Sequence, residues 1–137
     1  FYRPPRVGES GWGSLLPDQE PRPTVEVSTT TIDEHVASHA LDRVDLIKLD
    51  VEGAELRCLR GAGTTLRTRR PLVVLEANPG CLAREGRTPA DLQAILERER
   101  YRVGRLLLHR GQNGCTLVGV PGERDDALHE LRGSVEW

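Results

Sequence analysis

The sequence contains no methionine, a single lysine and no long apolar run. Because the chain starts at Phe1 and has no methionine, we expect a fragment or a processed chain with no signal peptide at its start. A membrane helix needs about 18 or more consecutive apolar residues, so no membrane span is expected. The three cysteines, Cys58, Cys81 and Cys115, form no CxxC pair and have no zinc-ligand spacing. They are typical of reduced thiols in a cytoplasmic protein.

Composition narrows the class of protein further. With 137 residues, 37% hydrophobic and 29% charged, the chain is long enough for one soluble globular domain. A net charge of -2 argues against nucleic acid as the main partner, because phosphate binding needs a basic field. His35 and His39 have the i,i+4 spacing of a metal pair, but no glutamate follows in an HExxH order. No metal site is therefore predicted.

Periodicity and turn residues divide the chain into alternating strands and helices. The expected elements are a strand at 24–28, a helix from 31, a strand at 44–51, a helix at 54–66, a strand at 72–76, a helix from 89, and strands at 102–108 and 116–120. Thr30 or Thr31 and then Thr88 are the predicted helix N-caps, and Gly61 and Gly63 should break the helix at 54–66.

This order predicts an α/β domain over residues 24–121, with a mostly parallel sheet that ends in an antiparallel hairpin. Residues 77–80 are expected to form a turn, and the glycine-rich residues 111–114 should connect the hairpin strands. Residues 1–23, rich in Pro, Gly and Arg, are predicted to be a flexible loop. Residues 122–137 are predicted to be a polar tail with at most a short helix around 126–131.

Charged residues gather where the two apolar strands end. Of the 19 Lys and Arg residues only Lys48 is lysine, and it precedes Asp50 and Glu52 at alternate positions. We expect the strand to be covered on both faces, with these three side chains on one side if it continues that far. The second strand ends in Glu76 and Asn78. Ligands of open α/β sheets bind beyond such strand ends, although a salt-bridged strand end that only pins the next helix is the alternative.

Gly53 and Glu55 follow the first strand, and both are expected to have structural roles. Gly53 should allow a sharp exit from the strand, and Glu55 should interact favourably with the dipole of the following helix.

Several segments together resemble one enzyme family. TTID at 30–33, DLIKLDVEGAE at 45–55, LRGA at 59–62 and the stretch from Arg70-Pro71 to Glu76 are similar to FkbM family methyltransferases, with a likeness that spans about residues 14–80. The resemblance implies an S-adenosylmethionine-dependent enzyme with a Rossmann-like fold. Such enzymes typically act on a hydroxyl of a small molecule, sugar or lipid.

The resemblance also implies that something is absent. In this fold a glycine-rich loop and a ribose-binding acid on the first strands hold the cofactor, and the sequence contains neither pattern. We therefore expect the C-terminal half of the fold, with the cofactor-binding residues before Phe1. As isolated, the chain should bind S-adenosylmethionine weakly or not at all and could be inactive alone. An exposed edge strand would favour pairing or aggregation, and the oligomeric state stays open.

The resemblance assigns roles to the strand-end residues. Asp50 or Glu52 would orient or deprotonate the acceptor hydroxyl, and Lys48 would set the charge of both. Glu76 and Asn78 would line the acceptor pocket. Two other functions stay open: a non-catalytic α/β module that binds a partner, and a metal-dependent hydrolase or transferase whose Asp50, Glu52 and Glu76 hold Mg²⁺ or Ca²⁺.

Overall fold

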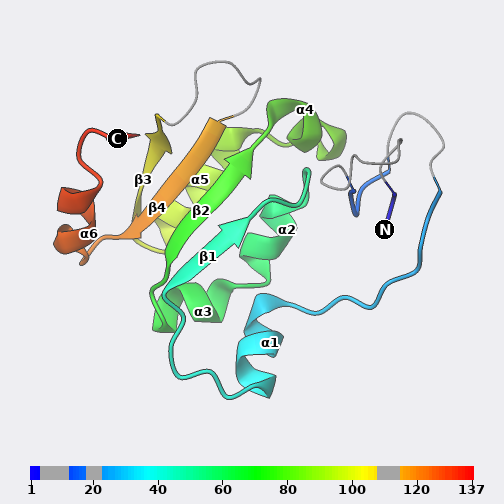
Figure 1. The fold of residues 1–137 in the computed structure, drawn as a ribbon, viewed down its shortest axis with the longest axis horizontal. Coiled ribbons are helices and arrows are strands. Elements are labelled where there is room, and N and C mark those ends of the chain that lie inside the picture. Colours follow the sequence, from blue (N-terminus) through cyan, green and yellow to red (C-terminus); the bar gives the residue numbers. More distant parts are fainter. Residues whose placement is uncertain (4–12, 18–22, 108–114) are drawn as a thin grey trace.

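The computed structural model describes residues 1–3, 13–17, 23–107 and 115–137. They form a five-stranded sheet with helices packed against it (Figure 1). The strands are β1 (Leu46–Leu49), β2 (Leu72–Ala77), β3 (Tyr101–Leu106), β4 (Cys115–Pro121) and β5 (Val135–Glu136). The helices are α1 (Ile32–Ser38), α2 (Glu55–Arg60), α3 (Gly63–Thr68), α4 (Pro79–Leu82), the 3₁₀ turn η2 (Ala83–Glu85), α5 (Pro89–Arg98) and α6 (Asp125–Glu130). The predicted spacer at 111–114 lies outside the described residues.

The sheet is mainly antiparallel, so the prediction of a mostly parallel sheet is wrong. The strand order is β1-β2-β4-β3-β5, and only β1 and β2 pair in parallel. The predicted antiparallel pairing of β3 with β4 is confirmed, but β4 also lies between β3 and β2 and runs opposite to both. Insertion of this strand separates β2 from β3 and replaces a parallel pairing by two antiparallel ones. An alternation of strands and helices along the chain does not reveal such an insertion.

Local signals placed most helix ends correctly. Thr31 caps α1, where its Oγ1 accepts from the Glu34 backbone N–H at 3.1 Å and its own N–H donates to Glu34 Oε2 at 3.0 Å. The helix expected at 54–66 breaks between α2 and α3, as its glycines predict. A turn was expected at residues 77–80, but Asn78 is the N-cap of the short helix α4.

Two further predictions were wrong or incomplete at the chain ends. Residues 24–28 form no extended strand, and only Thr24 makes an isolated bridge, to Tyr2. The C-terminal residues contain the expected short helix, α6, and also β5, which pairs with β3 and buries Val135.

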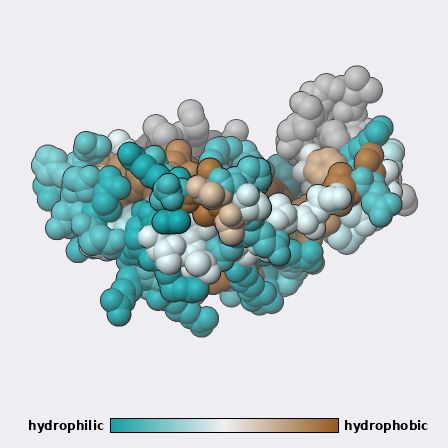
Figure 2. All heavy atoms as spheres, turned by 90° about the horizontal axis from the view of Figure 1, so that it is seen from below, coloured by the Kyte–Doolittle hydropathy of each residue, from teal (hydrophilic) through white to brown (hydrophobic). Residues whose placement is uncertain are grey.

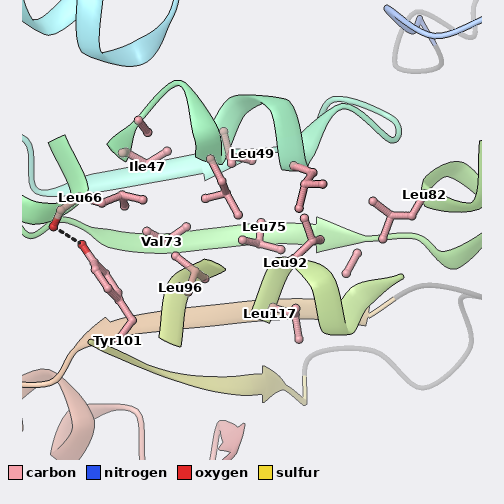
Figure 3. Close-up of a cluster of buried hydrophobic side chains, with 14 residues drawn as sticks. Ile47, Leu49, Leu66, Val73, Leu75, Leu82, Leu92, Leu96, Tyr101 and Leu117 are labelled. Atoms are coloured by element: carbon pink, nitrogen blue, oxygen red, sulfur yellow. Dashed lines mark hydrogen bonds between the residues drawn. The ribbon is translucent and has the colours of Figure 1, made fainter. Parts of the chain in front are cut away.

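The main core lies between one face of the sheet and helices α2, α3 and α5 (Figure 3). β1 contributes Ile47 and Leu49, and β2 contributes Val73 and Leu75, at alternate positions as a period of two requires. Tyr101 closes one end of this layer, where its buried hydroxyl donates to the Leu66 carbonyl oxygen at 3.2 Å. The spacing of the apolar residues in each strand therefore fixes which face packs against the helices.

The opposite face of the sheet is only partly covered. α6 packs on it through Ala127, which clusters with Val118 and Val120 of β4 and Val135 of the edge strand β5. β1 lies at the edge of the sheet among the described residues, and its Leu46 is 56% exposed. The expectation that this strand is covered on both faces is therefore wrong, because the alternation exposed–buried of Leu46 to Leu49 leaves one face open. Seen from below, the molecular surface is mostly hydrophilic, with apolar residues in small separate areas (Figure 2).

Candidate active site

The chain makes a sharp turn directly after β1. Glu52 has φ +51° and Gly53 has φ +106°, so both lie in the left-handed region. A Cβ at position 53 would lie 2.7 Å from the carbonyl oxygen of Cys81, which leaves room only for glycine. The predicted role of Gly53 as the point of exit from the strand is thereby confirmed.

Glu55 holds this turn in place. The residue is 2% exposed, and its carboxylate accepts hydrogen bonds from the backbone N–H of Val51 at 3.2 Å and of Gly53 at 3.1 and 3.2 Å. The sequence suggested only an interaction with the dipole of α2. The structure shows a buried acceptor that satisfies two backbone donors of the turn, and it explains why the motif ends in a second glutamate.

Lys48, Asp50 and Glu76 form a charged cluster at the carboxyl ends of β1 and β2. Lys48 Nζ lies 2.7 Å from Asp50 Oδ2, and the two side chains are 64% and 42% exposed. The parallel register pairs Lys48 with Val74 and Leu49 with Leu75, so Asp50 lies level with Glu76. The carboxyl groups of Asp50 and Glu76 share a hydrogen bond. The alternation of side chains along the strand predicts that Lys48 lies beside Asp50. The register between β1 and β2 places Glu76 next to this pair.

The charges of this cluster influence one another. The hydrogen bond from Lys48 lowers the pKa of Asp50, and the same bond raises the pKa of Lys48. Burial raises the pKa of Glu76, and its hydrogen bond to Asp50 raises it further. Of the two carboxyl groups, Glu76 therefore keeps its proton up to the higher pH.

The other two predicted site residues have local partners. β1 ends at Leu49, so Glu52 does not continue the alternation, and its Oε2 accepts a hydrogen bond from Cys81 Sγ at 3.2 Å. Burial and this hydrogen bond raise the pKa of Cys81 to about 11. Asn78 Oδ1 caps α4 by accepting from the Gly80 N–H at 3.0 Å and the Cys81 N–H at 3.4 Å.

Residues near the N-terminus pack against the same turn, which sequence reasoning missed. Ser14 Oγ donates to the Glu52 carbonyl oxygen at 3.2 Å and accepts from the Leu16 N–H at 3.0 Å. Both Ser14 and Leu16 are 2% exposed. Leu15 and Leu16 are an adjacent apolar pair in a segment otherwise rich in Pro, Gly and Arg.

Comparison with known families identifies the domain. Residues 3–103 match the model of the methyltransferase FkbM domain. The chain belongs to the FkbM methyltransferase family. Its members are S-adenosylmethionine-dependent methyltransferases, and the match includes the whole strand-end cluster. Searches of curated proteins and of solved structures gave no significant match.

The FkbM match extends the similarity found in the sequence. It starts at residue 3, before Ser14 and Leu16, which the likeness over about residues 14–80 already included and which support the turn after β1. It ends at residue 103, within β3. The helices of the described part of the chain include none long and apolar enough to cross a membrane. The same residues contain no group of three or more His, Cys, Asp or Glu side chains placed to hold a metal ion.

Proposed function

We propose that this FkbM domain methylates the oxygen of a hydroxyl group on a small molecule, sugar or lipid, with S-adenosylmethionine as the methyl donor. The observation that carries the proposal is an ionised carboxylate, Asp50, held by Lys48 and Glu76 at the carboxyl end of β1. Methyl transfer to oxygen needs a group that removes or polarises the hydroxyl proton. The three free cysteines support a reducing compartment such as the cytoplasm.

The cluster fits the reactive end of the proposed cofactor electrostatically. A sulfonium is a cation, and the lowered pKa of Asp50 keeps a negative charge at this strand end. When bound, S-adenosylmethionine supplies an electrophilic methyl carbon. Asp50 is the residue that we expect to face this end, with Glu52 on the adjoining turn.

Each residue of the cluster has a separate proposed role. Asp50 accepts the proton of the acceptor hydroxyl, because it is the ionised and half-exposed member of the pair. Lys48 keeps Asp50 ionised and fixes its orientation through the 2.7 Å contact. Glu76, which lies beside Asp50, lines the acceptor side together with Asn78. Glu52 orients the acceptor from the turn.

Substitutions in the full-length protein test these roles. We expect Asp50→Asn and Lys48→Met each to lower kcat by about 100-fold, the lower range for loss of a general base. Neither side chain is buried, so the unfolding temperature should change little. Removal of Lys48 should also move the acidic limb of the pH–rate profile to higher pH, because the ammonium group no longer lowers the pKa of Asp50.

Asp45→Asn is the matched control. Asp45 is an exposed carboxylate that precedes β1 at the opposite end of the strand and pairs with Arg43. The Asp45→Asn variant should leave kcat and the pH–rate profile unchanged. Full activity of both Asp50→Asn and Lys48→Met, measured by transfer of labelled methyl groups, would refute the assignment.

A further inference from the structure

Glu52 has a backbone conformation that glycine adopts more easily than glutamate. Its φ of +51° lies in the left-handed region, where a residue with a Cβ is strained. The next residue, Gly53, adopts the same region without this cost. Strain of this kind persists only where the surroundings hold the residue in place, and it gathers at functional sites. The conformation therefore points to a use of the Glu52 side chain beyond the turn itself.

Contacts from separate parts of the chain hold Glu52. Ser14 Oγ donates to its carbonyl oxygen at 3.2 Å, and the carboxylate of Glu55 accepts from the backbone N–H groups on either side of it. These contacts fix the main chain of the turn. The carboxylate of Glu52 has a different partner, because its Oε2 accepts a hydrogen bond from Cys81 Sγ at 3.2 Å. Cys81 therefore acts on the direction of the side chain rather than on the path of the backbone.

Cys81 is itself held by its own contacts. It lies in α4, which follows β2 at the same end of the sheet as the turn after β1 (Figure 1). The residue is 6% exposed, and its N–H donates to Asn78 Oδ1 at 3.4 Å. Its carbonyl oxygen lies 2.7 Å from the position that a Cβ of Gly53 would take. A donor fixed in this way can fix the direction of the acceptor to which it donates.

The thiol of Cys81 has the properties of a hydrogen-bond donor. Burial is the larger cause that raises its pKa to about 11, and the hydrogen bond to Glu52 raises the pKa in the same direction. The thiol therefore keeps its proton near neutral pH and can donate it. A buried thiol with a raised pKa is a poor nucleophile, so the geometry favours donation to Glu52 over covalent chemistry.

We propose that Cys81 is a positioning residue for methyl transfer, whose thiol holds the Glu52 carboxylate in the direction from which Glu52 orients the acceptor. The inference rests on the proposed function for the role of Glu52, which follows Asp50 at the end of β1. Cys81 acts through Glu52, so its effect on the reaction must disappear when the carboxylate is absent.

Vibrational spectroscopy of the chain tests the hydrogen bond without an acceptor. The Raman difference between each protein and the same protein with Cys81→Ala isolates the S–H stretching band of Cys81. Because a hydrogen bond lowers the stretching frequency of its donor, this band should move to higher frequency in Glu52→Ala. Asp50→Asn, which removes a neighbouring negative charge, should leave the band in place. A band that does not move in Glu52→Ala would overturn the proposal.

A double-mutant cycle in the full-length protein tests the role in the reaction. With labelled S-adenosylmethionine and the acceptor used for Asp50→Asn, Cys81→Ala should lower kcat/KM by about 5–10-fold, the change that loss of one hydrogen bond produces. Cys81→Ser keeps a donor and should retain most of the activity. In Glu52→Ala, the further change Cys81→Ala should lower kcat/KM no more, because the group that it positions is gone.

Cys58→Ala is the matched control, because it removes another partly buried thiol, from α2. It should leave kcat/KM unchanged, and thermal unfolding should show that all variants are folded. An equal loss in Cys58→Ala would overturn the proposal. So would a loss from Cys81→Ala that is the same with and without the Glu52 carboxylate, because the role of Cys81 would then be structural only.

The same measurements separate this inference from the proposed function. Full activity of Asp50→Asn and Lys48→Met refutes the roles of those two residues, but coupling between Cys81 and Glu52 would still support positioning by Cys81. Full activity of Glu52→Ala overturns the role of Cys81 alone, because Asp50 would then act without help from Glu52.

Discussion

Replacement of Glu55 by alanine should destabilise the fold strongly, although the residue is charged and lies in the first turn of a helix. The residue is 2% exposed, and its carboxylate is the acceptor for the backbone N–H groups of Val51 and Gly53. Each buried donor left without a partner costs about 1–3 kcal/mol. With two such donors, we expect Glu55→Ala to lower the free energy of unfolding by about 2–6 kcal/mol, a large part of the roughly 5–15 kcal/mol of a typical domain.

Glutamine at this position separates loss of an acceptor from loss of charge. Glu55→Gln keeps one acceptor oxygen and the volume of the side chain, so we expect a loss of about 1–2 kcal/mol. This variant also keeps the test usable if Glu55→Ala does not fold. Urea denaturation followed by circular dichroism measures both, and Glu130→Ala, which removes an exposed glutamate from α6, should stay within about 0.5 kcal/mol of wild type.

A loss in Glu55→Ala as small as that of Glu130→Ala would refute the reasoning. It would mean that water satisfies the two N–H groups of the turn without cost. The turn after β1 would then not depend on the second glutamate of the motif.

Two more predictions concern backbone geometry and pH. Gly53→Ala should cost about 1–3 kcal/mol, because φ is +106° and the new Cβ would lie 2.7 Å from the Cys81 carbonyl oxygen. Asp33→Asn should cost about 1–2 kcal/mol at pH 7, because Asp33 accepts from Thr64 and Thr65 at 2.7–2.8 Å. Burial raises the pKa of Asp33, but these bonds outweigh it and hold the pKa below 3.8, so its contribution is present above that pH and disappears as the pH falls through the lowered value.

Each of these has its own control. Gly86 also has a positive φ, +64°, but nothing lies within 4 Å of a Cβ there, so Gly86→Ala should cost less than Gly53→Ala in thermal unfolding. Equal costs would show that the contact with Cys81 is unimportant. For Asp33, the difference between wild type and Asp33→Asn in urea midpoints should shrink toward pH 2, and a difference independent of pH would contradict a charge-dependent bond.

Local chemistry was sufficient to predict the starts of α1, α2 and α5 and the strand cores. Thr31 with Glu34 three residues later specifies a capping box, whatever the helix later packs against. Apolar runs with turn residues at their ends likewise marked β2 and β3 within one or two residues. The motif around Asp50 was enough to suggest the family, because its residues are adjacent in the chain.

Pairings between distant segments were not predictable in the same way. The position of β4 between β2 and β3 depends on which strand edge is free after the helices have packed, and no short stretch of sequence records this. The exposure of Lys48 follows from the edge position of β1, so the expected burial was wrong. Ser14 and Leu16 contact the turn across about forty residues of chain, and their neighbours gave no periodic pattern.

The sequence by itself determined the caps, the glycine at position 53 and the identity of the charged residues at the strand ends, because each of these depends on neighbours a few residues away. Only the tertiary structure decided that Glu76 meets Asp50 and that arginines from α2, from η2 and from the loop before α5 line one cavity. Those groupings depend on strand register and helix packing, which bring together residues that lie far apart in the chain.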